Sequence, residues 1–389
     1  MIESNAPGGR LRVLAVVARF KWSHIDYLAA LGNEVDLWST WSSTGSEGAP
    51  ERAVFEGVRL RPLGALATDG EEAVCAALAD SIERVQPDLI HVMYYTHERL
   101  TVITRRLAPG IPLVWECRDP ITTLTRASPA SPTWALEGEA LRAADGHILV
   151  TEATRDYYER GHGVDLSDAL IVPHAFAARL AGPLRPKLSS VDGRTHIALV
   201  GTAADDPRHG RYYVDIIRRL VAMGFVVHSH FHEEIDGVSL EPYERLDRVL
   251  TDYHHHPTVS FRDGERLSDL TSRYDLMGVF HELDSPEPEF NEAPTLEICM
   301  PTKAVSAWFH GAIPVVTFAS YRGLVETIER LGIGFVVDDW EGVADLVGDH
   351  ERIESASRAC RAHREEFSHE YQARRIAAFY ERVKSRREH

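Results

Sequence analysis

The strongest constraint on the fold is a regular alternation of strand-length apolar runs with amphipathic segments. In the first half of the chain such runs lie at 11–18, 88–93, 112–116 and 146–150, and segments with helical spacing separate them. Short runs that are apolar almost throughout are typical of parallel strands buried on both faces. Repeated strand–helix units with short connections therefore predict a mainly parallel sheet covered by helices.

The alternation stops at a stretch rich in Pro, Gly and Ser and then resumes, with later strand-like runs that include 258–261 and 313–317. Two blocks of similar length predict an α/β protein with two doubly wound, Rossmann-like domains. We expect its ligands beyond the carboxyl ends of the strands, in the cleft between the domains. The predicted divisions are an N-terminal domain at 1–178, a linker at 179–194, a C-terminal domain at 195–365 and a helix at 366–389 that packs back on the N-terminal domain.

The charge and the cysteines exclude several classes of function. Lys plus Arg number 42 and Asp plus Glu 59, which gives a net charge of −17. Such a surface repels phosphate backbones and anionic headgroups, so we expect no nucleic-acid partner. No apolar run reaches the roughly 18 residues of a membrane span, and no secretory signal is recognised, so we expect no integral membrane association. The four cysteines form no CxxC pair, which favours a reduced, cytoplasmic protein.

The stretch 300–317 is the most informative motif. It reads as Pro-Thr-Lys, a short helix at 303–310, a Gly stop and a buried strand. An ammonium group beside the first turn of a helix favours anions, so Lys303 is a candidate ligand for a diphosphate. The alternative is an ordinary solvated helix start. Gly201, which follows the first strand of the second block, permits close approach of a ligand to the backbone, or simply forms a strand-to-loop turn.

Several segments in a fixed order carry a family resemblance. They are GNEVDL at 32–37, PDLIHV at 87–92, AADGHILVTEATRDYY at 143–158, LIVPHAF at 170–176, HIALVGTAADDPRHGR at 196–211, and YDLMGVFHE followed by PTKAVSAWFHGAIPVV at 274–316. Together they resemble the retaining, two-domain GT-B glycosyltransferases of the group-1 or family-4 type over essentially the whole chain. Two departures are clear: Ser306 stands where much of the family has a ribose-binding glutamate, and a Gly-x-Gly after the second donor-domain strand is absent.

The resemblance implies transfer of a sugar from a nucleotide-activated donor, with retention and without a bound metal or other cofactor. Retaining transfer needs the leaving diphosphate neutralised and the acceptor hydroxyl aligned, tasks that cations and hydrogen-bond acceptors perform. The implied catalytic residues are His97, Arg118 and Asp119. The implied donor-binding residues are Gly201, His209, Arg211, Asn291, Glu292, Thr302, Lys303 and Ser306. The implied acceptor-binding residues are His24, Tyr94 and Tyr95.

Other interpretations remain open. Arg118 and Asp119 alternatively form a loop salt bridge, and Arg211 a surface helix start. The alternating His228, His230 and His232 suggest a metal site, but no carboxylate or cysteine set at a known ligand spacing accompanies them. The stretch 22–31 lacks Lys and Arg, which favours a soluble, small-molecule or saccharide acceptor over a lipid. Two further alternatives are a GT-B enzyme that forms no glycosidic bond and a catalytically silent GT-B partner protein.

Overall fold

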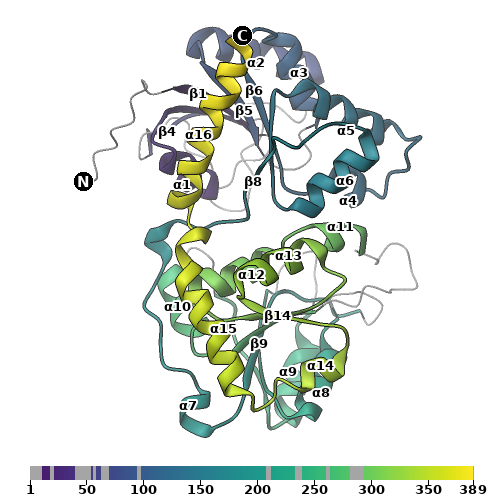
Figure 1. Cartoon of the computed structure of the whole chain (residues 1–389), viewed down its shortest axis with the longest axis vertical. Helices are drawn as coiled ribbons and strands as arrows, with labels where there is room; N and C mark the ends of the chain where they lie inside the picture. The colour runs from purple at the N-terminus through teal and green to yellow at the C-terminus, as the bar shows by residue number, and fades with distance from the viewer. Residues whose placement is uncertain are drawn as a thin grey trace. The chain divides into compact units, whose positions relative to one another are not determined.

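The computed structural model divides into two compact units (Figure 1). It describes residues 11–17, 22–39, 54–55, 58–62, 70–93, 98–206, 212–232, 239–259, 263–280 and 293–388. The first unit comprises Met1–Val150, Thr154–Val172 and His369–His389, and the second comprises Thr151–Ala153 and Pro173–Ser368. Each unit contains its own mainly parallel sheet, so the predicted two doubly wound α/β domains are confirmed.

The first unit is built on an eight-stranded sheet of order β3-β4-β2-β1-β5-β6-β7-β8 in the described residues. All pairs are parallel except β3 with β4. The strands are β1 (Arg12–Val17), β2 (Glu34–Ser39), β3 (Val54–Phe55), β4 (Val58–Pro62), β5 (Leu89–Met93), β6 (Leu113–Cys117), β7 (Gly146–Leu149) and β8 (Leu170–Ile171). The central strands β5 and β6 are buried along their whole length, as their mostly apolar sequences predict.

Helices α1 to α6 connect these strands, and the last helix of the chain returns to the same unit. Their bounds are α1 (Trp22–Ala30), α2 (Gly70–Val85), α3 (Glu98–Leu107), α4 (Ile121–Leu124), α5 (Pro132–Ala143), α6 (Glu152–His162) and α16 (His369–Glu388). α16 packs beside α1 and buries Ile376, Phe379 and Val383 in the core. A Cβ on Gly146 would meet Val383 Cγ2 at 2.5 Å, so a glycine is needed where α16 crosses β7.

The second unit has a six-stranded parallel sheet of order β11-β10-β9-β12-β13-β14 in the described residues. Its strands are β9 (His196–Thr202), β10 (Val226–His232), β11 (Tyr253–His255), β12 (Leu276–Val279), β13 (Val315–Phe318) and β14 (Gly334–Val337). Its helices are α7 (Ser189–Asp192), α8 (Val214–Met223), α9 (Glu241–Val249), α10 (Gly264–Thr271), α11 (Ala293–Ile298), α12 (Thr302–Ser306), α13 (Arg322–Leu331), α14 (Trp340–Ala344) and α15 (His350–His363). Short 3-10 turns lie at Ala178–Leu180 and Arg364–Phe367.

Two local predictions differ from the structure. The strand expected at 258–261 is absent at 258–259, and 260–261 lie outside the described residues. A strand forms earlier instead, as β11 at Tyr253–His255, where the backbone pairs with β10. The helix expected at 303–310 is instead α12 followed by a π-helical turn at Ala307–Gly311. In the described part of the chain, no helix is long and apolar enough to cross a membrane.

Candidate functional site

The ends of three elements of the second unit meet around Lys303. β9 ends at Thr202, Tyr213 immediately precedes α8, and Lys303 is the second residue of α12. The Lys303 ammonium donates a hydrogen bond to the Tyr213 hydroxyl at 2.9 Å and lies 5.4 Å from the centre of that ring. A Cβ on Gly201 would lie 3.8 Å from Lys303 Cδ. The structure therefore brings together two of the predicted donor-binding residues, Gly201 and Lys303.

Local backbone chemistry explains this arrangement. Gly201 has a φ of +120°, a backbone conformation that residues other than glycine rarely adopt. The Lys303 side chain passes over this glycine. Pro301 precedes α12 in an extended conformation and so fixes where the helix begins. Of the other candidates on α12, Thr302 is exposed, whereas the Ser306 side chain is buried in the helix face that packs on the unit.

Most of the remaining sequence candidates lie outside the described residues. These are His97, Tyr94, Tyr95, His209, Arg211, Asn291 and Glu292. His24 lies in α1, but the structure does not describe its side chain. Their assigned roles stay predictions.

In the first unit, the predicted catalytic residues Arg118 and Asp119 follow β6. Arg118 is only 4% exposed; its guanidinium pairs with the Glu116 carboxylate and donates to the Val172 carbonyl at 3.1 Å. Glu116 lies in β6 and Arg118 follows the last residue of that strand, so the ion pair stands at the carboxyl end of β6. Asp119 is half-buried beside them.

Glu116 is the centre of a buried polar network that sequence reasoning missed. Tyr27 donates its hydroxyl to Glu116 Oε2 at 3.0 Å, and His91 Nε2 lies 3.2 Å from the same oxygen. The Tyr380 hydroxyl of α16 in turn contacts His91 Nδ1 at 2.7 Å. Burial alone would raise the pKa of Glu116, but the Arg118 charge and the neighbouring His91 and Tyr27 outweigh it and lower the pKa to about 2. The carboxyl group is therefore ionised at neutral pH.

A second carboxyl group missed by sequence reasoning lies at the start of α3. Glu98 is 1% exposed, and burial together with the nearby Glu137 raises its pKa to about 7. Glu137 itself is fully buried; it accepts a hydrogen bond from Thr122 Oγ1 at 2.6 Å and lies 2.8 Å from His162 Nε2. Glu98 directly follows the predicted catalytic residue His97 in the sequence, and this position is the signal that could have identified it.

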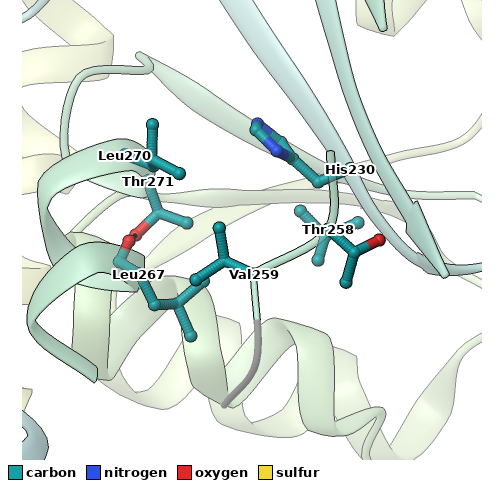
Figure 2. A pocket seen from close by; sticks show the side chains of 7 residues that line it. His230, Thr258, Val259, Leu267, Leu270 and Thr271 are labelled. Carbon is teal, nitrogen blue, oxygen red and sulfur yellow. Dashed lines mark hydrogen bonds between the residues drawn. The ribbon is translucent and has the colours of Figure 1, made fainter. Parts of the chain in front are cut away.

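A small apolar pocket lies near the carboxyl ends of β9 and β10 (Figure 2). α10 contributes Leu267, Leu270 and Thr271 on one side, and His230 and Thr258 lie opposite. His230 Nε2 contacts the Tyr274 hydroxyl at 2.8 Å, and burial lowers the pKa of His230 to about 4. The imidazole is thus neutral at physiological pH.

The histidines of β9, β10 and β11 form a connected cluster. His228 lies 2.9 Å from His196 and 3.0 Å from His256 through ring nitrogens, and its ring stacks on Tyr274. Burial, followed by the neighbouring imidazoles, lowers the pKa of His228 to about 2. Within the described ranges, no group of three or more His, Cys, Asp or Glu side chains is arranged to hold a metal ion. The predicted independence from metal stays a prediction.

Residues 17–175 match a family described as the glycosyl transferase 4-like domain. No protein with a curated description matches the chain. Among solved structures, the chain is similar to sucrose-phosphate synthase from Thermosynechococcus elongatus, with 15% identity over 97% of this chain and 100% of that one and a TM-score of 0.69.

Two similar structures were determined with nucleotides. One, described as trehalose-6-phosphate from E. coli bound with UDP-2-fluoro glucose, is 13% identical over 96% of this chain and 99% of that one, with a TM-score of 0.65. The other, Anabaena HepE in complex with UDP, is 13% identical over 97% and 98%, with a TM-score of 0.58. At such identities the likeness shows the fold, and it confirms the predicted GT-B fold.

Proposed function

Because the chain carries a glycosyl transferase 4-like domain and has the GT-B fold, we propose that it transfers the sugar of a nucleotide-activated donor to a small soluble acceptor. In this proposal the reaction proceeds with retention and needs no metal. The observation that carries it is the convergence of Lys303, Gly201 and Tyr213 at the carboxyl edge of the second sheet. Ligands of doubly wound sheets bind at this edge.

The charge of the donor explains why Lys303 is central. A nucleoside diphosphate leaves with negative charge on its terminal phosphate, and a fixed cation stabilises that charge as it develops. The chain as a whole has a net charge of −17, so a local cation must offset the repulsion of the donor. The two similar structures that hold UDP-2-fluoro glucose and UDP support a diphosphate ligand.

We assign the other roles from the sequence. Around the donor, His209 and Arg211 assist Lys303 at the phosphates, Gly201 and Thr302 offer backbone and hydroxyl contacts, Ser306 lies near the ribose, and Asn291 and Glu292 meet the sugar. In the first unit, His97 and Asp119 act at the acceptor hydroxyl, and His24, Tyr94 and Tyr95 hold the acceptor. The burial of Arg118 against Glu116 favours a role in fixing the loop that carries Asp119. The four free cysteines favour a cytoplasmic location.

Replacing Lys303 by methionine should weaken binding of the preferred nucleoside diphosphate by about 1.5–3 kcal/mol, because a charge-assisted hydrogen bond to a phosphate is lost while the apolar stem is kept. Isothermal titration calorimetry measures this change. Lys384→Met in α16 is the matched control and should bind like the wild type. An unchanged affinity in Lys303→Met would refute the role of Lys303.

Product analysis separates the proposed activity from its alternatives. Incubation with the matching sugar nucleotide and candidate acceptors should release the nucleoside diphosphate and form a glycoside. Consumption of the sugar nucleotide without any glycoside would identify a GT-B enzyme of another reaction type. Absence of both binding and turnover would identify a silent partner protein, and Ser306, in place of the expected glutamate, would then be the first residue to restore.

A further inference from the structure

We infer that Tyr213 is a positioning residue for Lys303, whose ammonium group it holds at the carboxyl edge of the second sheet. The inference rests on the proposed function, because the ligand that Lys303 binds in that proposal is the diphosphate of the donor. Tyr213 belongs to no motif of the sequence analysis. Its role emerges from the contact between its hydroxyl and Lys303 Nζ at 2.9 Å, which joins residues 90 positions apart.

Tyr213 is itself firmly fixed. Its side chain is 1% exposed, and its ring stacks on Phe231 with 5.0 Å between the ring centres and 17° between the planes. Its backbone N–H donates to the Tyr243 hydroxyl at 3.2 Å, and that hydroxyl donates to the Ala204 carbonyl at 2.6 Å. The ring of Tyr213 is therefore anchored to β10, and its backbone is anchored through Tyr243 to the segment that follows β9.

Lys303 gains from such an anchor because its side chain is long and flexible. A lysine with four rotatable bonds loses much conformational freedom when a ligand fixes it, and that loss weakens binding. The contact with Tyr213 and the passage over Gly201 restrict the side chain before the ligand arrives. A tyrosine hydroxyl is a suitable anchor, since it accepts the hydrogen bond as a neutral group and leaves the positive charge of the ammonium uncancelled.

Tyr213→Phe tests the inference because it keeps the ring on Phe231 and removes only the hydroxyl. Dissociation constants are measured for the preferred nucleoside diphosphate and for the corresponding nucleoside, in the wild type, Tyr213→Phe, Lys303→Met and the double variant. We expect Tyr213→Phe to weaken the diphosphate about 3- to 10-fold and to leave the nucleoside unchanged. Added to Lys303→Met, it should cause no further loss, because the two residues act through one contact.

A purely structural role for Tyr213 predicts different results. In that case Tyr213→Phe would weaken binding of the nucleoside and of the diphosphate alike. Alternatively, it would weaken diphosphate binding by the same factor whether residue 303 is Lys or Met. Either result would overturn the inference. Tyr253→Phe is the matched control, because it also removes a buried hydroxyl of the second unit, one that contacts Ser229 Oγ at 2.7 Å. The control should lower the melting temperature without changing the preference for diphosphate over nucleoside.

Failure of the inference is distinguishable from failure of the proposed function. If the wild type binds no nucleoside diphosphate, the proposed function fails and the inference fails with it. If the wild type binds one and Lys303→Met weakens it, but Tyr213→Phe binds as tightly as the wild type, only the positioning role of Tyr213 is wrong.

Discussion

Replacing Glu116 by glutamine should lower the free energy of unfolding of the first unit by about 3–5 kcal/mol, the usual cost of removing one partner of a buried ion pair. Arg118 would keep its charge at 4% exposure without the carboxylate that now pairs with it. Tyr27 and His91 would also lose a charged neighbour. Urea unfolding measures the loss, and hydrogen exchange of β5 and β6 peptides identifies the transition that belongs to the first unit.

The matched control for this variant is Glu139→Gln in α5. Glu139 makes the same kind of ion pair with Arg106, at 3.7 Å, but both side chains are more than half exposed. Solvent screens such a pair, so we expect a loss of at most about 1 kcal/mol. Removing both charges, with Glu116→Gln and Arg118→Met together, should recover part of the stability. Equal small losses for Glu116→Gln and Glu139→Gln would show that Glu116 does not balance the Arg118 charge.

Lowering the pH from 7.5 to 5 should destabilise the second unit by about 2 kcal/mol for each of His228 and His230. The pKa of these residues is about 2 and about 4 in the folded chain, against an ordinary value of 6.5. Below about pH 6.5 the unfolded chain therefore binds protons that the folded chain does not. The stability is fully present above that pH and is lost as the pH falls toward 4.

The imidazoles of His228 and His230 are surrounded mainly by other histidines. His196, His254, His255, His256, Tyr274 and Asp192 lie around them on the same sheet and its adjoining segments. His230→Gln removes one titrating group. The free energy of unfolding that this variant loses between pH 7.5 and 5 should therefore be about 2 kcal/mol smaller than the loss in the wild type. His350→Gln, at an exposed position, should leave the difference unchanged. An identical pH dependence for His230→Gln and the wild type would contradict the buried, neutral state of His230.

The sequence contained enough information for the architecture because buried parallel strands are apolar along most of their length, even where a polar residue such as His91 or Glu116 is buried among them. β1, β5 and β6 stand at positions that such runs predict. β11 was misplaced because its histidines look like polar loop residues, although His254 and His255 are half-buried in the strand and His255 contacts the buried Ser229. The π-helical turn was missed because the spacing of its side chains resembles that of an ordinary helix.

The candidate site was predictable only in part. Lys303 and Gly201 could be chosen one by one, since a lone lysine at a helix start and a glycine after a strand are visible in the sequence. Tyr213 could not, because its importance depends on a contact across 90 positions. Glu116 offered a usable signal, since an acidic residue two positions before Arg118 at the end of a predicted strand is a candidate ion-pair partner. Burial, which sets the pKa of Glu98, cannot be read from a single sequence.

The most direct test of nucleotide-sugar transfer as the function is whether the chain recognises one nucleotide. A thermal-shift screen with UDP, GDP, dTDP, ADP and CMP, with a chelator present and no metal added, makes this measurement. A ligand at 100 times its dissociation constant stabilises the folded chain by about 2.7 kcal/mol, which gives a clear rise in melting temperature. We predict that one of the five raises the melting temperature and that Lys303→Met reduces the rise. A flat response to all five would contradict the assignment of a nucleotide-sugar donor site.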